Sequence, residues 1–325
     1  MLSTVLLRTA LTAYINGLSF RAVRASCSNL ARLSQLGAVD ISHDALQRLL
    51  ACDHDWSSDL LTHSAALLAG KRGWLIIDDT VIAKPFSRQL AMLSRHWSSS
   101  DQRYLTGINC VLLIWTDGDT RLPVAARLYE KSSGRSKLDL AIEMLQQVHR
   151  LLKPHVDYVL FDSWYAATKL LKQVRHLGYH WVTRLKSNRT LNGIRADEFF
   201  RYRYGHAQVR LAHGERALAV KHERIVLASS DTSLRLRQLK HLYKQRQWIE
   251  ELIKILKSHL SIESCSARSE TAQRAHIHLC LLAFCRLEQE RLRHGIATIY
   301  RLREMLFNCQ IPATLAWNLS LPVTA

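Results

Sequence analysis

Residues 73–80 read Gly-Trp-Leu-Ile-Ile-Asp-Asp-Thr, a short apolar run that stops at a pair of carboxylates. Residues 157–165, Asp-Tyr-Val-Leu-Phe-Asp-Ser-Trp-Tyr, repeat the arrangement with a second carboxylate after a second apolar run. Runs of this length are typical of buried strands in an α/β sheet. We therefore expect Asp78 and Asp162 to emerge at strand ends, although aspartate is also common there as a simple turn residue.

A third acid belongs to a helical pattern over residues 239–260. Tyr243, Arg246, Glu250 and Lys257 are spaced Y-x2-R-x3-E-x6-K, which on one continuous helix places all four within an arc of roughly 60°. Apolar residues occupy the neighbouring arc, so the segment is predicted to be an amphipathic helix whose polar stripe lines a groove. The alternative is a solvated helix face, because the arginine and the glutamate form an i,i+4 pair of opposite charge.

The elements between these acids follow a recognisable order. Strand-forming residues, a turn and a further strand are followed by a helix that a proline ends, and then by the strand that precedes the second acid. We expect these elements at 104–116, 122–129, 137–152 and 156–161. Strands that carry an acid, a helix, a strand that carries a second acid and a later helix that carries a third resemble the ribonuclease H-like fold.

The spacing of the helical pattern resembles the signature that DDE transposases of the IS4 type carry around their third catalytic acid. The contexts of Asp78, followed by Asp79-Thr80, and of Asp162, followed by Ser-Trp-Tyr, resemble the first and second acids of the same family. The three acids are almost evenly separated (162 − 78 = 84 and 250 − 162 = 88). The resemblance implies that Asp78, Asp162 and Glu250 are the catalytic and metal-binding residues. Asp79 stays open as the first acid, since neighbouring strand residues face opposite ways.

The resemblance also implies the chemistry and the partners. A metal-dependent transposase would cleave the transposon ends and join them to target DNA, with two Mg²⁺ or Mn²⁺ ions held by the three carboxylates. Tyr243, Arg246 and Lys257 would bind phosphates of the transposon end. The partners would be double-stranded DNA, as terminal repeats and as target, and a second copy of the chain, because two ends must meet in one complex.

Charge and composition agree with a protein that binds nucleic acid. The 325 residues hold 45 Lys and Arg against 27 Asp and Glu, which gives a net charge of +18. Such a chain attracts polyanions without regard to sequence, although a ribosomal or RNA-binding protein would fit equally. The seven cysteines form no C-x-x-C pair, which favours reduced thiols. With no signal peptide and no membrane-spanning run, we expect a cytoplasmic, nucleoid-associated bacterial protein.

We expect an α/β protein with three parts. Residues 1–68 are predicted to form a helical DNA-binding region, either a helix-turn-helix or a bundle that packs on the core, with Ser42 as an N-cap. Residues 69–260 are predicted to form a ribonuclease H-like catalytic core that contains a β-rich insertion at about 184–236. Residues 261–325 are predicted to form a helical C-terminal region.

Two other functions fit parts of the pattern. A transposase-derived DNA-binding protein without catalysis would have no need of all three acids. A ribonuclease H-like, metal-dependent DNA nuclease would use the same metal site, and only the tyrosine, the arginine and the lysine of the signature favour transposition over it. Trp164 and Trp248 are candidates for base stacking, but the core is the favoured interpretation for both.

Overall fold

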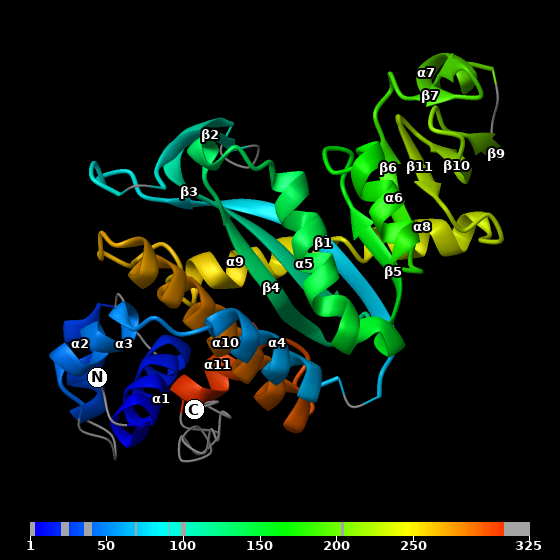
Figure 1. Ribbon diagram of the computed structural model, residues 1–325. Coiled ribbons are helices and arrows are strands. Elements are labelled where there is room, and N and C mark those ends of the chain that lie inside the picture. Colours follow the sequence, from blue (N-terminus) through cyan, green and yellow to red (C-terminus); the bar gives the residue numbers. More distant parts are fainter. Residues whose placement is uncertain are drawn as a thin grey trace.

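A computed structural model gives the structure of the chain (Figure 1). It describes residues 4–20, 26–35, 41–68, 70–90, 92–98, 102–202 and 205–308. The α-helices are α1 (Thr4–Phe20), α2 (Cys27–Gln35), α3 (His43–Ala51), α4 (Trp56–Ala66), α5 (Lys137–Leu152), α6 (Thr168–His176), α7 (Ala196–Phe199), α8 (Leu236–Lys244), α9 (Gln247–Ser258), α10 (Glu270–Arg293) and α11 (Ile299–Phe307).

The strands lie mainly in the middle of the chain. They are β1 (Gly73–Ala83), β2 (Ser94–Ser98), β3 (Arg103–Thr116), β4 (Arg121–Tyr129), β5 (Val156–Phe161), β6 (His180–Leu185), β7 (Thr190–Leu191), β8 (Ile194–Arg195), β9 (His206–Arg210), β10 (Arg216–His222) and β11 (Ile225–Ser229). Two short 3-10 helices, η1 (Lys131–Ser133) and η2 (Lys153–His155), flank α5.

One sheet organises the described part of the chain. Its strands follow the order β2-β3-β1-β5-β6-β11-β10-β9, and β4 also pairs with β3. β1, β3 and β4 form an antiparallel meander, whereas β5 and β6 run parallel to β1. The sub-order β4-β3-β1-β5-β6 with these directions is that of the ribonuclease H-like fold, so the predicted fold class is confirmed.

The parallel part of the sheet is built from two crossovers. α5 connects β4 with β5, and α6 connects β5 with β6. The α5 helix begins at a capping box in which Ser136 and Asp139 exchange side-chain and backbone hydrogen bonds, an arrangement that satisfies two free N–H groups. The bounds of α5 and β5 are those predicted from the sequence.

The β-rich insertion extends the core sheet directly. β11 pairs antiparallel with β6, from Val226 opposite Leu185 to Ser229 opposite Val182. β10 and β9 then add the last two strands, while β7 and β8 form a separate two-stranded sheet. Hydrogen bonds between β11 and β6 therefore join these strands to the core sheet, and they lie on the right-hand side of Figure 1.

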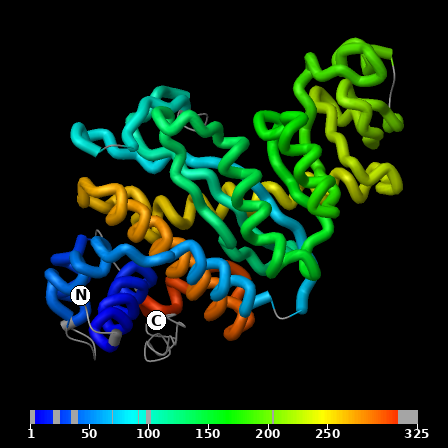
Figure 2. The backbone as a smooth tube through the Cα atoms, in the orientation of Figure 1, coloured from blue at the N-terminus to red at the C-terminus, as the bar shows by residue number. Residues whose placement is uncertain are grey.

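Helices from the N-terminal and C-terminal parts of the chain pack together beside β4, away from the insertion strands. α1, α3 and α4 pack on α10, and α4 and α10 also pack on β4. Figure 2 shows these N-terminal helices beside the C-terminal ones. Ser42 caps α3 as predicted, because its hydroxyl accepts a hydrogen bond from the Ala45 N–H. None of the described helices combines the length and the apolar character needed to cross a bilayer.

Candidate active site

The register of β1 against β5 brings the first two acids together. The parallel pairing ends where Ile77 lies opposite Phe161, so the next residues on the two strands are Asp78 and Asp162. β5 ends there as predicted, but β1 does not. β1 continues to Ala83, because its antiparallel pairing with β3 runs on past the two acids. The expectation of a strand end at Asp78 is therefore wrong, although the two acids do lie side by side.

Burial changes the protonation of Asp78. Its side chain is only 21 % exposed, and burial raises the pKa of its carboxyl group to about 6. Arg246 opposes that increase in pKa, and the negative charges of Asp79 and Asp162 add to it. A buried carboxyl group beside another acid resists ionisation until a cation compensates it. Perturbed pKa values of this kind are common at functional sites.

Asp79 points to the opposite face of the sheet. Its carboxylate forms an ion pair with Lys137 at the start of α5 (Nζ to Oδ2, 2.6 Å). It also accepts hydrogen bonds from the side chains of Asn109 (2.8 Å) and Tyr165 (3.0 Å). These three donors tie β1 to β3, to α5 and to the turn after β5. Asp78 instead faces α9, so the two neighbours have different surroundings, as the alternation of strand side chains requires.

The helix predicted over residues 239–260 is two helices. α8 ends at Lys244 and α9 begins at Gln247. At the junction the N–H groups of Gln245 and Arg246 bond to carbonyls three residues back, which makes this turn tighter than an α-helical turn. The two helices pack on different strands, α8 on β6 and β11 and α9 on β1. The expectation of one unbroken helix is therefore wrong.

Arg246 gathers most of the predicted residues around itself. Its Nη1 lies 2.6 Å from Oδ2 of Asp78, and its Nη2 contacts the carboxylate of Glu250 one helical turn away. The charges of Asp162 and Tyr243 also act on the guanidinium, and with Asp78 and Glu250 they raise the pKa of Arg246 against the effect of burial. Five of the six predicted site residues thus share one neighbourhood.

Lys257 lies apart from this group. It is in the last turn of α9, and its ammonium is 3.6 Å from Oε1 of Glu263. The same Glu263 oxygen accepts a hydrogen bond from the N–H of Ala83 at the end of β1 (3.1 Å). Lys257 therefore sits farther along the β1 and α9 pair, and no contact joins it to the acids.

The turn after β5 presents an aromatic side chain beside Asp162. The Asp162 carboxylate accepts hydrogen bonds from the N–H groups of Trp164 (2.8 Å) and Tyr165 (3.3 Å). Trp164 is 46 % exposed, and the ammonium of Lys137 lies 5.3 Å from its ring centroid. The core interpretation of Trp164 is therefore wrong. Trp248, by contrast, packs against the core as expected.

The donor set fits a hard divalent cation. Asp78, Asp162 and Glu250 offer only carboxylate oxygens, the ligands that Mg²⁺ prefers. Across the described residues no three His, Cys, Asp or Glu side chains form a ready-made metal cage. The positive charge among the acids is that of Arg246, which contacts Asp78 and Glu250 together. A cation bound by these two acids would take over the role of that guanidinium.

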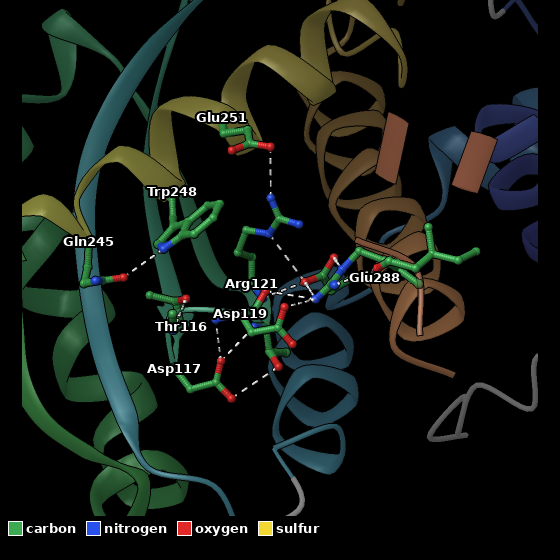
Figure 3. A network of polar contacts seen from close by, with 12 residues as sticks. Thr116, Asp117, Asp119, Arg121, Gln245, Trp248, Glu251 and Glu288 are labelled. Carbon is green, nitrogen blue, oxygen red and sulfur yellow. Dashed lines mark hydrogen bonds and ion pairs between the residues drawn. The ribbon is translucent and has the colours of Figure 1, made fainter. Parts of the chain in front are cut away.

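A buried polar network holds α9 in position, and no sequence pattern indicates it. Arg121, at the start of β4, lies 3.1 Å from Oε1 of Glu251 and 3.5 Å from Oε1 of Glu288 in α10 (Figure 3). Its guanidinium carbon also lies 4.9 Å from the ring centroid of Trp248. Arg291 completes the network through Glu288 (2.9 Å). Sequence spacing does not reveal such contacts, because they join residues 130 and 167 positions apart.

Comparison with solved structures gives remote similarities. The catalytic domain of human endonuclease V is 13% identical (77% of this chain, 96% of that chain, TM-score 0.27). The NurA nuclease from Sulfolobus solfataricus is 10% identical (74% and 86%, TM-score 0.27). The Mos1 strand transfer complex is 11% identical (82% and 78%, TM-score 0.22). No curated protein matches the chain.

The family match is independent of these structures. Residues 69–286 match the family model described as the transposase DDE domain, a span that contains all three acids and the whole sheet. DDE transposases act on DNA and generally use divalent metal ions. The chain belongs to the transposase DDE domain family.

Proposed function

We propose that this protein is the transposase of an IS4-type insertion sequence, which cleaves transposon ends and transfers them into target DNA. One observation carries the proposal: Asp78 and Asp162 follow the last paired residues of β1 and β5, and Glu250 joins them through Arg246. The Y-x2-R-x3-E-x6-K spacing, with Tyr243 beside this group, supports the IS4 type.

In this proposal Asp78, Asp162 and Glu250 hold two Mg²⁺ or Mn²⁺ ions. When bound, the ions activate the attacking oxygen and stabilise the charge on the leaving oxygen. Asp78 is preferred to Asp79 as the first acid, because the Asp79 carboxylate already has three donors on the other face of β1. The raised pKa of Asp78 supports the same assignment, since a bound cation would favour its ionised form.

The basic residues would hold the DNA. Once a cation compensates the acids, the guanidinium of Arg246 is available for a bidentate contact with a phosphate near the scissile bond. Tyr243, in the last turn of α8, would contact the same region. Lys257 follows Arg246 by 257 − 246 = 11 positions, or about 16 Å at helical rise. It would therefore reach a different phosphate, farther along the strand.

The reaction has two steps. In the first, a water oxygen bonds to the phosphorus at the transposon boundary, the bond to the 3′ oxygen breaks, and that oxygen takes a proton to become a free 3′ hydroxyl. In the second, this hydroxyl oxygen bonds to a phosphorus of the target, whose own 3′ oxygen leaves with the proton. Both steps need an in-line geometry, which the site residues supply by positioning the phosphates.

The remaining assignments follow from the same proposal. Two terminal repeats must meet in one complex, so a homodimer on DNA is the expected active form. Residues 1–68 would add DNA contacts, residues 69–260 would form the catalytic core with its insertion at about 184–236, and residues 261–325 would support assembly. The protein would act on the bacterial nucleoid, in the cytoplasm.

The test is cleavage of a labelled duplex that carries the element's terminal repeat, with Mg²⁺ or Mn²⁺. Glu250→Gln is compared with Glu270→Gln, since Glu270 also forms an i,i+4 pair with an arginine, Arg274, but lies on α10. Nicking at the repeat boundary should disappear in Glu250→Gln and persist in Glu270→Gln, while both variants still bind the duplex.

The same assay separates the two other functions. If the intact protein binds the repeat and never cuts it, it is a DNA-binding protein without catalysis. If it cuts but never joins the end to a target plasmid, it is a nuclease. Equal cutting by Glu250→Gln and the intact protein would contradict the assignment of Glu250.

A further inference from the structure

A two-stranded ribbon leaves the core sheet at the end of β1. β3 pairs with β1 only as far as Gly107 opposite Ala83. Before that point, from Arg103 to Thr106, β3 pairs with β2 alone. In Figure 1 this ribbon lies at the opposite end of the sheet from the insertion strands β9 to β11. The ribbon needs an explanation, because a hairpin without a sheet on either side is only marginally stable in water.

One face of the ribbon exposes aromatic side chains. Trp97 is 52 % exposed and Tyr104 is 60 % exposed, and they lie directly opposite each other in the register. Their rings meet edge to face with centroids 5.3 Å apart. Neither side chain packs against the hydrophobic core. Large exposed aromatics that stabilise no core are typical of binding surfaces.

The surroundings of this aromatic pair are basic. Arg95 lies on the same face, two residues before Trp97, and its guanidinium carbon is 5.4 Å from the ring centroid of Tyr104. Arg103 precedes Tyr104, and Arg88 lies on the loop that leads into β2. Residues 84–106 contain four basic residues and one acidic residue, Asp101. Such a surface complements a polyanion and repels a basic partner.

The ribbon extends from the end of the sheet at which the acids lie. β1 runs past Asp78 toward the ribbon, and β5 ends at this same edge. Asp78 lies opposite Leu112 of β3, and Tyr104 is 112 − 104 = 8 residues from it. At strand rise that is roughly 27 Å, a span that equals about eight base pairs of duplex DNA.

We propose that the β2–β3 ribbon is a second DNA-contacting surface, which grips duplex DNA about eight base pairs from the scissile phosphate. Trp97 and Tyr104 pack on the apolar edges of sugars and bases in a groove, and Arg95 and Arg103 bind phosphates. The major groove of B-form DNA admits a two-stranded β-ribbon. The distance to the scissile phosphate rests on the proposed function, whereas the contact with duplex DNA does not.

The experiment measures binding of the full chain to three labelled probes. The first is a duplex that extends fifteen base pairs to either side of the repeat boundary, the second is a duplex cut back to five on each side, and the third is a single strand. The double variant Trp97→Ala, Tyr104→Ala is compared with Phe307→Ala. Phe307 is 48 % exposed, and the guanidinium carbon of Arg303 lies 5.6 Å from its ring centroid, but Phe307 lies on α11.

The ribbon variant is expected to bind the long duplex at least ten-fold more weakly and to bind the short duplex as the intact protein does. Phe307→Ala should match the intact protein on both. Trp97→Phe with Tyr104→Phe should restore most of the affinity, which excludes a general folding defect. Replacing Arg95 and Arg103 by glutamine should lower the slope of log affinity against log salt concentration by about 2.

Three results would overturn the inference: unchanged affinity for the long duplex, equal weakening on the short one, or a loss confined to the single strand. A cleavage assay on the same proteins separates this test from the test of the proposed function. If the intact protein cuts nothing but the length-dependent loss is seen, the proposed function fails and the ribbon contact stands. If the intact protein cuts and the ribbon variant binds the long duplex equally well, only the ribbon contact fails.

Discussion

Two arginines of this protein each join two carboxylates, and they meet α9 at consecutive residues. Arg246 contacts Glu250 and Asp78, and Arg121 contacts Glu251 and Glu288. The difference is exposure. In the first cluster Glu250 is 50 % exposed, and Arg246 and Asp78 are 20 % and 21 % exposed. In the second Arg121 is 2 % exposed and Glu288 is fully buried, while Glu251 at 30 % is the member nearest the solvent. One side of α9 thus carries an open cluster and the other a closed one.

Exposure decides what each cluster can do. A buried pair is costly to break, because removing one partner leaves an uncompensated charge away from water. A partly exposed pair contributes little to stability, and water, a cation or a phosphate can replace either partner. The closed cluster therefore fixes the position of α9, and the open cluster is free to exchange partners. The following predictions test this division.

The largest effect on stability is expected from Arg121→Met. It removes the guanidinium from Glu288, which keeps Arg291 and the backbone N–H of residue 121, and it removes the partner of Glu251. The free energy of unfolding should therefore fall by about 3–5 kcal/mol. Urea denaturation of the metal-free protein measures it. Arg246→Met is the matched control and should cost less, because Glu250 is half-exposed and the Asp78 carboxyl group can take up a proton when it loses its partner. Equal losses would mean that the two clusters do not differ as proposed.

A smaller effect concerns pH and Asp78. Its folded-state pKa of about 6 exceeds the ordinary aspartate value of 3.8. The protonated carboxyl group therefore stabilises the fold below about pH 4, and this stabilisation disappears as the pH rises through 6. The difference is worth at most about 3 kcal/mol. Asp78→Asn should therefore gain stability relative to the intact protein between pH 4 and pH 7. Urea titrations at several pH values measure the free energy of unfolding of both proteins. A difference between them that stays constant from pH 4 to pH 7 would contradict this prediction.

Metal ions should act on the open cluster alone. At a Mg²⁺ or Mn²⁺ concentration ten times the dissociation constant, binding to the folded state stabilises it by about 1.4 kcal/mol. The increase in melting temperature should be lost in Asp78→Asn and Glu250→Gln and kept in Glu251→Gln. Removal of the ions by a chelator should reverse it. An equal increase in all three variants would indicate that the ions bind elsewhere.

The smallest effect is expected for the open pair itself. Glu250→Gln removes an i,i+4 contact of a half-exposed side chain, so the free energy of unfolding should change by less than about 0.5 kcal/mol. Thermal and urea unfolding without metal ions measure this change. A loss as large as that of Arg121→Met would show that Glu250 supports the fold rather than the chemistry.

Local patterns predicted the core elements well. α5 and β5 begin and end where helical periodicity, Pro154 and the apolar run after it place them. The order of elements then led to the ribonuclease H-like topology, and the apolar runs led to two neighbouring acids. These features depend on residues close together in sequence, which is why sequence reasoning reached them.

Features that depend on distant partners were beyond local patterns. β1 continues through Asp78 because β3 pairs with it, and α8 ends before Arg246 because the two helices pack on different strands. The Arg121 cluster joins β4, α9 and α10. Trp164 is exposed because it lies in the turn after β5, where its backbone N–H donates a hydrogen bond to the Asp162 carboxylate. None of these leaves a periodic or compositional trace.

The dependence of α9 on α10 has a consequence for synthesis on the ribosome. Asp78 and Asp162 leave the exit tunnel well before Glu250, and the network that links α9 to α10 forms only when Glu288 has also been made. A nascent chain therefore carries two of the three acids on a partly formed sheet, without the helix that completes the set. Until α10 folds against β4, α9 lacks the contact of Arg121 with Glu288, so the helix that carries Glu250 is the last of the three acid-bearing elements to be fully held in place.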